Sequence, residues 1–401
     1  MSSPDSQEIV ILGGNFGGVS VAHYVLRHVV PRLNALNPST TYHVTMVSPS
    51  THAFFKIAAP RVLVSPDLIP FSKVFRSIAE AFKEYPSGSA KGVDAEKKVV
   101  TLEDGTILSY AALVIATGTK SESPLWTLNG PHEETMQAHK DIQAALPNAK
   151  SVLIAGGGPA GVESTGEIAA RFPAKVTILS GSTRLLTRSE DESFGHDAEN
   201  RLKEMGVEVI HNVRVTLVKK GKPTEVTLSD GTTRQVDLYI DATGGRPNNS
   251  FVPSSWLNEK GQILNDYDTM RVKIPSVKYV YAIGDVASYS RGAAVDVGNA
   301  VPPLGTSVYL DLEAAVGGQN EKTGESHGGL FSWILPSKST GLKQKTFKPM
   351  DVYIIPIGPK GGVGILFGHR IPSFMVWLLK CRDFLVGRFD VTMTGSDVAK
   401  P

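Results

Sequence analysis

The sequence predicts an α/β protein in which one parallel-sheet unit occurs twice and a smaller α+β unit follows. The first unit has an apolar strand over 9–12, the glycine-rich turn GGNFGG over 13–18, a helix over 19–33 and a strand over 42–48. The second unit repeats this order, with the strand SVLIA, the turn GGGPAG over 156–161, a helix and the strand KVTILS over 175–180. Strand, helix and strand in this order form a right-handed βαβ unit with parallel strands.

The two glycine turns indicate what these units bind. Gly156, Gly158 and Gly161 satisfy the pattern G-x-G-x-x-G, in which the turn and the helix N-terminus receive the pyrophosphate of a dinucleotide. The first turn has Asn15 at the third place of this pattern. Asparagine tolerates positive φ better than most residues and its amide can donate to phosphate, so we expect this turn to bind as well. We therefore predict two Rossmann-like dinucleotide-binding domains.

Each unit also ends in a second apolar strand that carries Ala-Thr-Gly. These strands are ALVIATGTK over 112–120 and LYIDATGGRPN over 238–248, where glycine lets the chain approach a bound dinucleotide closely. A hairpin precedes each strand, with its turn at Asp104-Gly105 or at Asp230-Gly231. A further strand, in KYVYAIGDVASY, ends with an aspartate, Asp285. This side chain either caps the next turn or accepts hydrogen bonds from a polyol chain of the ligand, and the two roles are compatible.

The last part of the chain differs in character. The segment VPPLGTSVYLDLEAAVGG predicts a helix that starts at its prolines and ends at Gly317-Gly318. Strands in KPMDVYIIPIG and GGVGILFG then precede a helix that starts after Pro372. The apolar residues of this last helix fall at helical spacing: Phe374, Trp377, Leu378, Cys381, Phe384 and Leu385.

Composition excludes several classes of protein. At 401 residues and a net charge of +2, the chain predicts two or three domains and no nucleic-acid face. The single cysteine, Cys381, excludes an internal disulfide, a dithiol redox pair and a cysteine-rich zinc site. The ten histidines lack metal-ligand spacing, so we predict no metal site. The N-terminus does not resemble a secretory signal and no apolar stretch reaches the roughly 20 residues that span a bilayer, so we expect a cytoplasmic protein.

Together, these segments resemble a known family. The motifs VILGGNFGG, VIATGT, IAGGGPAGVESTGEI, DATGGRPN, YAIGD and GGVGILFG…LLKCRDFLVGR are similar to those of the apoptosis-inducing-factor-like (AMID-type) proteins. These are glutathione-reductase-like flavoproteins with two dinucleotide-binding domains, in a branch that includes a ferroptosis-suppressing quinone reductase. The resemblance implies an FAD domain over 1–120 and 275–325, a connector over 121–149 with a short helix, an NAD(P)H domain over 150–272 and a C-terminal domain over 326–401.

The resemblance also implies two cofactor sites. FAD is expected at Gly13, Gly14, Asn15, Phe16, Gly17, Gly18, Ser48, Lys56, Ala116, Thr117, Gly118, Gly284 and Asp285. NADPH or NADH is expected at Gly156, Gly158, Pro159, Ala160, Gly161, Glu163, Ser180, Ser182, Arg184, Thr243 and Gly244. The chemistry is then that of the cofactors, with hydride passing from nicotinamide to flavin and electrons passing on to a small quinone-like acceptor.

The strand after the second turn bears on the choice between NADH and NADPH. An acid about 20 residues beyond the glycines would bind the ribose of NADH. Ser180 and Ser182 stand there instead, and Arg184 and Arg188 follow. An arginine can pair with a 2′-phosphate, which favours NADPH. The alternative is that both arginines are only solvated.

Two residues are candidates for catalysis. Glu163, four residues before Glu167 on one helix face, is expected near the nicotinamide and the flavin. The alternative for Glu163 is a carboxylate that only stabilises the helix N-terminus. Lys56 is expected as a cation near the flavin ring, and the alternative is a surface lysine. Phe54 and Phe55 are expected in the core or in the wall of the flavin site.

The C-terminal helix and the acceptor leave alternatives open. The helix either forms a wall of a quinone entry or rests on a membrane surface. Alternatively, it packs on the FAD domain or on a second subunit, and in the last case the protein would be a homodimer. Two other functions compete with quinone reduction. One is reduction of a protein or of a biosynthetic substrate. The other is that of a flavin-bound regulatory protein that senses NAD(P)H and binds partners.

Overall fold

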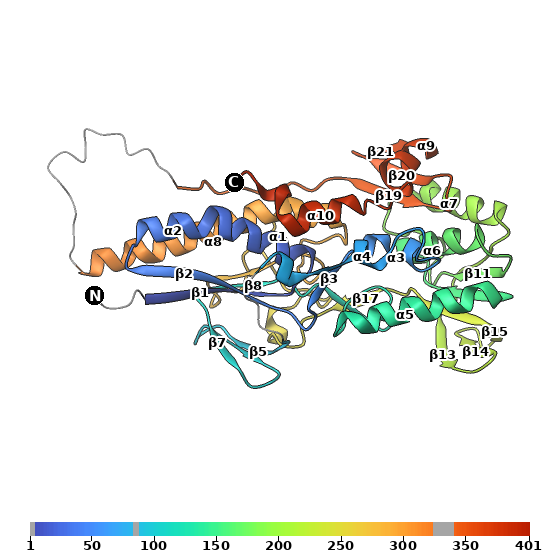
Figure 1. The fold of residues 1–401 in the computed structure, drawn as a ribbon, viewed down its shortest axis with the longest axis horizontal. Helices are drawn as coiled ribbons and strands as arrows, with labels where there is room; N and C mark the ends of the chain where they lie inside the picture. The colour runs from blue at the N-terminus through green and yellow to red at the C-terminus, as the bar shows by residue number, and fades with distance from the viewer. Residues whose placement is uncertain (1–4, 83–87, 324–340) are drawn as a thin grey trace.

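The computed structural model describes residues 5–82, 88–323 and 341–401 and contains two four-stranded parallel sheets (Figure 1). The first sheet has the order β18-β8-β1-β2 and consists of β1 (Asp5–Leu12), β2 (Thr40–Val47), β8 (Ala112–Ile115) and β18 (Val280–Ala282). The second has the order β12-β11-β10-β16 and consists of β10 (Ser151–Ala155), β11 (Lys175–Leu179), β12 (Glu208–Ile210) and β16 (Leu238–Asp241). The predicted duplication is confirmed.

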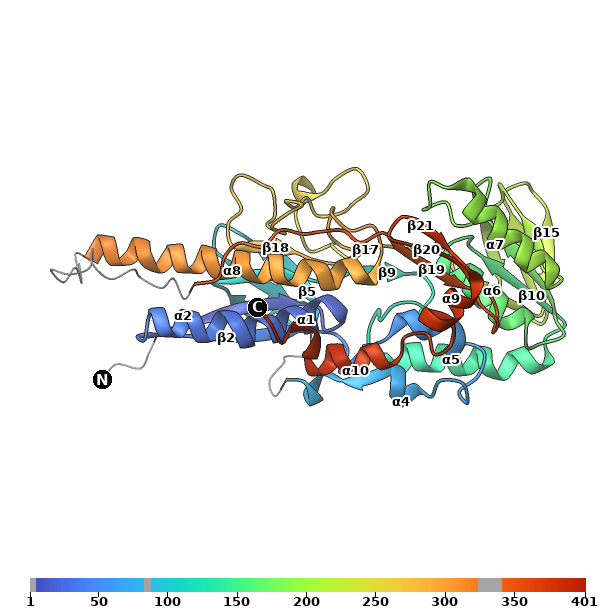
Figure 2. The ribbon, with the colours of Figure 1, turned by 90° about the horizontal axis from the view of Figure 1, so that it is seen from above.

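A helix follows each glycine turn. α1 (Phe16–Tyr24) continues through the π-helical turn η1 (Val25–Val29) into α2 (Val30–Leu36), and α6 (Pro159–Ala169) follows the second turn. α1 has seven buried residues, and it lies beside α8 (Ala294–Thr323) on the same face of the first sheet (Figures 1 and 2).

The bounds of α8 correct the sequence prediction. Pro302 and Pro303 lie inside the helix rather than at its start, and the helix continues past Gly317. Packing explains the tolerance, because Leu304 and Val308 are fully buried and Gly305 lies against the ring of Tyr24. Burial of one whole helix face outweighs the backbone hydrogen bonds that the prolines remove.

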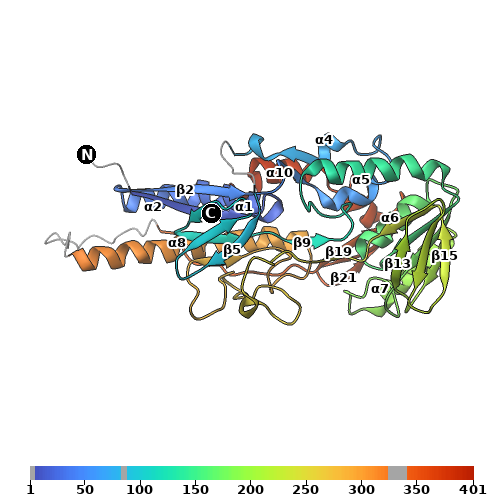
Figure 3. The same ribbon diagram turned by 90° about the horizontal axis from the view of Figure 1, so that it is seen from below.

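An antiparallel sheet accompanies each parallel sheet. One contains β5 (Ala90–Asp94), β6 (Val99–Leu102) and β7 (Ile107–Ser109), and the other contains β13 (Val215–Lys219), β14 (Thr224–Leu228) and β15 (Thr233–Val236). Gly105 and Gly231 occupy the hairpin turns with φ of +88° and +86°, which confirms the two Asp-Gly predictions. The β13–β15 sheet lies at one end of the molecule, beyond the second parallel sheet (Figure 3).

A two-stranded ribbon joins the two halves and moves a domain boundary. β9 (Thr119–Ser121) pairs with β17 (Gly245–Pro247), so the chain crosses back just after β16. Beyond this point Val93 donates to the carbonyl of Phe251, and Ile263 bridges Ala287. The predicted end of the NAD(P)H domain at 272 is therefore too late, because the segment after β17 packs on the first half. The predicted border at 325/326 lies outside the described residues.

Shorter elements complete the two halves. The connector carries α5 (His132–Ala145), a helix of 14 residues. The first half also contains β3 (His52–Phe54), β4 (Phe75–Ser77), α3 (Ala59–Val62) and α4 (Phe71–Val74), and the second half contains α7 (Glu192–Glu204).

The C-terminal segment bridges both halves. Its antiparallel sheet consists of β19 (Val352–Pro356), β20 (Gly362–Leu366) and β21 (His369–Ile371) and lies beside α6 and α7, whereas α10 (Gly387–Thr394) lies on α1 (Figures 1 and 2). His23 and His28, from α1 and η1, contact the carbonyl oxygens of Met393 and Val398 at 2.9 and 2.8 Å. This α+β unit therefore ties the two halves together.

The predicted C-terminal helix is interrupted. α9 (Ser373–Val376) and the π-helical turn η6 (Trp377–Cys381) end before a non-helical turn in which Phe384 and Leu385 have φ of +51° and +61°. The single helix expected after Pro372 is therefore corrected to two helical pieces. The turn buries Phe384 completely in the core, which offsets the unfavourable backbone conformation.

Candidate active site

The two glycine turns share one geometry. Gly13 and Gly156 have φ of +116° and +125°, and a Cβ on them would lie 2.4 and 2.2 Å from the carbonyl oxygens of Ala116 and Ala242. A Cβ on Gly18 would lie only 1.7 Å from the carbonyl oxygen of Gly13, and Gly161 meets the same restriction at 1.9 Å from that of Gly156. Each turn is thus pressed against its strand and its Ala-Thr-Gly segment, as close dinucleotide binding requires.

Asn15 fits this geometry without a left-handed backbone. Its φ is −118°, so the expected need for a residue that tolerates positive φ does not arise. Its Oδ1 atom is buried and has no hydrogen-bond partner among the residues that the structure describes. Rotation of the amide by half a turn would place Nδ2 there, where it can donate to a phosphate oxygen. The residues present therefore fit a pyrophosphate at this turn.

Both helix N-termini are also free to receive an anion. α1 begins after Asn15 and α6 after Gly158, and neither helix has a side-chain N-cap or an acidic residue in its first turn. Unpaired backbone N–H groups and the helix dipole favour negative charge at such positions.

One cavity of about 1140 Å³ extends from the first glycine turn past α6 to the C-terminal sheet. Sixteen of the predicted residues line it: Gly13, Gly14, Asn15, Phe16, Gly17, Ser48, Lys56, Ala116, Thr117, Gly118, Pro159, Ala160, Glu163, Gly244, Gly284 and Asp285. The remaining predicted residues do not line it: Gly18, Gly156, Gly158, Gly161, Ser180, Ser182, Arg184 and Thr243. Of the four glycines that do not line it, Gly18, Gly156 and Gly161 shape the turns through close backbone approaches, whereas a Cβ on Gly158 would meet no described atom within 4 Å.

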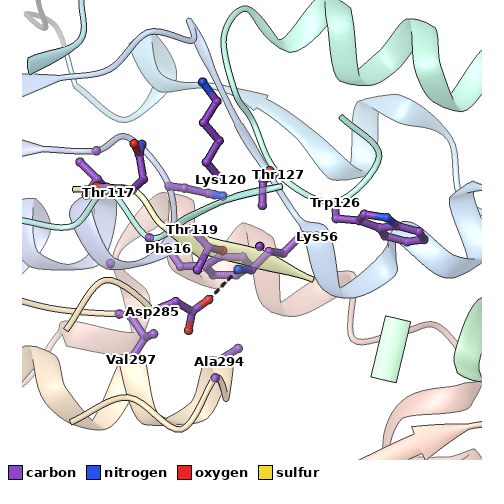
Figure 4. A pocket seen from close by; sticks show the side chains of 18 of the residues that line it. Phe16, Lys56, Thr117, Thr119, Lys120, Trp126, Thr127, Asp285, Ala294 and Val297 are labelled. Carbon is purple, nitrogen blue, oxygen red and sulfur yellow. Dashed lines mark hydrogen bonds and ion pairs between the residues drawn. The ribbon is translucent and has the colours of Figure 1, made fainter. Parts of the chain in front are cut away.

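Lys56 and Asp285 form an ion pair across the cavity (Figure 4). The ammonium of Lys56 donates to Oδ2 of Asp285 at 2.9 Å, and the hydroxyl of Ser290 donates to Oδ1. The ammonium holds the pKa of the Asp285 carboxyl below its usual range. Lys56 is therefore a cavity residue and not a free surface lysine, and the pair presents one cation and one acceptor to a bound ligand.

Three of the predicted hydroxyl residues already donate hydrogen bonds within the protein. Ser48 donates to the carbonyl of Ser50, and Thr117 donates to the carbonyl of Asn248. Thr243 donates from both its backbone N–H and its hydroxyl to Asp241. Ser48 and Thr117 thus shape the cavity wall, whereas Thr243 shapes the turn after β16.

Glu163 pairs with a lysine that the sequence analysis did not select. Lys380, in η6, donates to Oε1 of Glu163 at 2.5 Å and to the carbonyl oxygen of Ile354 at 3.2 Å. Burial raises the pKa of the Glu163 carboxyl, and Lys380 opposes this shift. Both residues line the cavity, so a carboxyl and an ammonium meet where α6 faces the C-terminal sheet. The signal in the sequence was a single lysine inside an otherwise apolar helical stretch.

The second carboxylate of α6 faces another partner. Arg61 donates from Nε and Nη2 to the two oxygens of Glu167 at 3.0 and 2.8 Å, and from Nη1 to the carbonyl oxygen of Cys381 at 2.6 Å. The guanidinium also lies 4.5 Å from the ring centroid of Phe384. Glu163 and Glu167 therefore share a buried helix side but serve different contacts.

Three polar side chains of the turn after β11 already have partners within the protein. Ser180 donates to the carbonyl of Arg184, which donates in turn to the carbonyl of Ser189. Arg188 donates to the carbonyl of Gly292, and its guanidinium lies 4.7 Å from the ring centroid of Tyr353, which lines the cavity. Both arginines are thus engaged in contacts and are not simply solvated.

Three apolar side chains of the C-terminal segment are exposed. Phe374, Trp377 and Leu378 are 67%, 41% and 51% exposed, whereas Cys381 and Phe384 are buried. The expectation that this apolar face packs on the FAD domain therefore fails for the first three residues. Across residues 5–82, 88–323 and 341–401, no helix combines the length and the apolar character that a membrane span needs.

Comparison with known proteins agrees with this architecture. Residues 7–302 match the family model for pyridine nucleotide-disulphide oxidoreductases. The whole chain is similar to the oxidoreductase phnG of Penicillium herquei, with 35% identity and 99% of that protein covered. Similarity to ferroptosis suppressor protein 1 of Homo sapiens is 25%, over 97% of this chain and 96% of that protein. The fold is similar to that of the sulfide:quinone oxidoreductase of Aquifex aeolicus, with a TM-score of 0.65 and 16% identity over 98% of this chain and 93% of the other.

Proposed function

The chain belongs to the pyridine nucleotide-disulphide oxidoreductase family, and on that premise we propose that it reduces a quinone-like acceptor in the cavity between α6 and β19. The predicted resemblance to apoptosis-inducing-factor-like proteins is confirmed by relatives that match nearly the whole chain. The protein is an FAD-dependent NAD(P)H oxidoreductase.

The residues of the chain hold and separate the two cofactors. FAD, when bound, takes electrons from NAD(P)H and delivers them to the acceptor. The N–H groups at the start of α1 and the amide of Asn15 would hold its pyrophosphate, and Asp285 would accept from its ribityl hydroxyls. The start of α6 would hold the pyrophosphate of NAD(P)H, and the buried strands behind both turns exclude water.

The feature that carries the proposal is the apolar part of the cavity beside Lys380. Its wall there consists of Ile57, Pro60, Val352, Ile355 and Leu385. A flat apolar ring fits such a wall, and a quinone must also gain two protons with its two electrons to become the quinol. The ammonium of Lys380 can donate a hydrogen bond and one proton to a quinone oxygen, and the two electrons together with the other proton would come from FAD, when bound. The Glu163 carboxylate would hold the Lys380 side chain in place, and solvent would reprotonate the amine.

Anaerobic stopped-flow spectroscopy tests this proposal. The purified yellow protein is reduced with NADH or NADPH and then mixed with a short-chain ubiquinone, a naphthoquinone, a ferredoxin or ferricyanide. We expect rapid reoxidation of the flavin by at least one quinone and slow reoxidation by ferredoxin. Fast reoxidation by ferredoxin alone would replace the quinone with a protein acceptor. A reduced flavin that persists with every acceptor would favour the sensing function.

The exposed apolar residues of α9 and η6 support a second part of the proposal, that the acceptor enters from a membrane surface. Phe374, Trp377 and Leu378 would insert among lipids close to the segment that carries Lys380. Co-sedimentation with phospholipid vesicles tests this contact, with Phe374→Ser/Trp377→Ser/Leu378→Ser as the variant. We expect the variant to lose vesicle binding and to keep turnover with a water-soluble quinone. A different result would be that the wild type does not bind vesicles and elutes as a dimer in size-exclusion chromatography, while the variant elutes as a monomer. The exposed apolar face would then be a subunit interface.

A further inference from the structure

Arg214 lies beside the end of β11, although it is far from the glycine turn in sequence. In a dinucleotide-binding βαβ unit, the ribose of the adenosine lies at the carboxyl end of the second strand. Here that strand ends at Leu179, and Ser180 and Gly181 follow. A Cβ on Gly181 would lie 3.0 Å from Cζ and 3.1 Å from Cγ of Arg214. The arginine side chain therefore lies directly over the glycine, and a Cβ at this position would displace it by a few tenths of an ångström.

The backbone fixes this position. β12 is the neighbour of β11 in the sheet, so the loop that follows β12 emerges at the same edge. In that loop Asn212 donates to the carbonyl of Ser182 at 3.1 Å, and Val213 donates to that of Ser180 at 3.2 Å. The N–H of Arg214 donates to the hydroxyl of Ser229 at 3.0 Å. Hydrogen bonds on both sides thus hold Arg214 against the turn.

The guanidinium of Arg214 is not neutralised by a carboxylate of the described residues. It is exposed, its only side-chain hydrogen bond is a long one of 3.4 Å to the carbonyl of Gly181, and it has no ion pair with any residue of the described ranges. Arg184 and Arg188, by contrast, are engaged with the carbonyls of Ser189 and Gly292. Arg184 is only partly exposed and its unpartnered Nη1 is buried, and Arg188 also lies over the ring of Tyr353, so Arg214 has the weakest contacts of the three arginines around this turn.

The chemistry of the turn selects the ligand. Ser180 stands where an acid would accept hydrogen bonds from both ribose hydroxyls of NADH. Its own hydroxyl donates to the backbone carbonyl of Arg184. The hydroxyl of Ser182 makes no hydrogen bond to any described residue. A free guanidinium, a free hydroxyl and no carboxylate match a phosphate dianion on the ribose.

We propose that Arg214 binds the 2′-phosphate of NADPH and, with Ser182 beside it, sets the preference for NADPH over NADH. This inference rests on the proposed function, because it takes the second glycine turn as the NAD(P)H site. It also changes the residue expected to bind this phosphate, since Nη2 of Arg184 donates to the carbonyl of Ser189 and its Nη1 is buried, whereas the Arg214 side chain is exposed. Arg214 would clamp the phosphate through two N–H groups, a geometry that a lysine cannot reproduce.

Isothermal titration calorimetry on the flavin-loaded protein tests the inference without turnover. The probes are 2′,5′-ADP and 5′-AMP, which differ only by the phosphate at issue. We expect the wild type to bind 2′,5′-ADP at least about tenfold more tightly than 5′-AMP, because a charged pair with phosphate is the added contact. Arg214→Gln should bring the two affinities together by weakening 2′,5′-ADP alone, and Arg214→Lys should recover part of the difference. Arg246→Gln, at an exposed arginine of β17, is the matched control and should leave both affinities unchanged.

The possible failures are distinguishable. Equal affinities in the wild type, or a difference that survives in Arg214→Gln, would overturn the role of Arg214 while the nucleotide site stands. Absence of binding by both probes, together with a flavin that neither NADH nor NADPH reduces, would overturn the proposed function as well.

Discussion

The guanidinium of Arg61 holds both carboxylate oxygens of Glu167, and this pair joins all three parts of the chain. Arg61 belongs to α3 in the first half and Glu167 belongs to α6 in the second. The carbonyls of Cys381 and Arg382 in the C-terminal segment accept hydrogen bonds from Nη1 of Arg61. The Glu167 side chain has no exposed surface, and that of Arg61 is 8% exposed. The relative placement of the two glycine turns thus depends on a buried ion pair.

Removal of Arg61 is therefore expected to destabilise the whole protein. In Arg61→Met the carboxylate of Glu167 stays buried, and Arg171, at 2.8 Å, is the one cation still paired with it among the described residues. Breaking one side of a buried pair costs about 3–5 kcal/mol of the free energy of unfolding. The measurement is urea unfolding followed by far-UV circular dichroism and flavin fluorescence. Arg171→Met is the control, with an expected loss of about 1 kcal/mol or less, because Arg171 is partly exposed. Equal losses in the two variants would contradict the bridging role of Arg61.

The pair of Lys380 and Glu163 makes a prediction about turnover. Lys380→Met removes the proton donor from the apolar end of the cavity and leaves Glu163 buried without its partner. We expect kcat with a short-chain quinone to fall by a factor on the order of 10², while NAD(P)H still reduces the flavin. Lys380→Arg should restore part of the rate, because it keeps the charge. Arg382→Met, at a mostly exposed arginine two residues further on, should leave kcat unchanged. Loss of quinone turnover with no change in its pH profile would argue that Lys380 acts through structure alone.

The first glycine turn makes a prediction about flavin content. Gly18→Val should lose FAD, because its Cβ would lie 1.7 Å from the carbonyl oxygen of Gly13, and Gly13→Val should do the same. Asn15→Gly should keep FAD, since the backbone there is extended. The measurement is the ratio of flavin to protein absorbance after purification, with circular dichroism to show which variants remain folded. To separate binding from folding, Asn15→Asp adds a negative charge next to the expected pyrophosphate and should weaken FAD in a folded protein. Full flavin occupancy in a folded Gly18→Val variant would mean that FAD binds elsewhere.

Local rules account for the parts of the fold that the sequence predicts. The two glycine turns, the strands beside them and the hairpins at Gly105 and Gly231 depend on neighbours within a few residues, so local sequence patterns predict them. Local sequence patterns do not predict the bounds of α8 or the break in the C-terminal helix at Phe384. Prolines continue through α8 because the helix packs on α1, and Phe384 adopts a left-handed backbone because its ring is buried.

The same distinction applies to the candidate site. The glycines, Lys56, Glu163 and Asp285 were found from motifs and from the family resemblance, and the structure places all three side chains at one cavity. Their partners could not be found in this way. Lys380 is 217 residues from Glu163, and Arg61 is 106 residues from Glu167. Only the folded C-terminal segment and the packing of α3 on α6 bring these charges together.

Fully buried His139 makes stability depend on pH. It lies on α5, where its Nε2–H donates to the carbonyl of Leu125 at 3.1 Å and its Nδ1 has no partner in the described part of the chain. The rings of Phe54 and Phe71 pack against it, and burial lowers its pKa to about 4. In the unfolded chain the pKa of histidine is about 6.5, so between these values the unfolded state binds a proton that the folded state does not.

Stability should therefore fall as the pH drops from about 6.5 towards 4, and this one group contributes a loss of about 3 kcal/mol by the lower end. The measurement is the free energy of unfolding in urea at several pH values between 4 and 8. His139→Gln keeps a side-chain donor for the carbonyl of Leu125 but has no proton to gain, so its stability should fall less steeply over this range. His196→Gln, at an exposed position on α7, is the matched control and should keep the pH dependence of the wild type. If the free energy of unfolding of His139→Gln falls with pH as steeply as that of the wild type, then the pKa of His139 is not lowered in the folded protein.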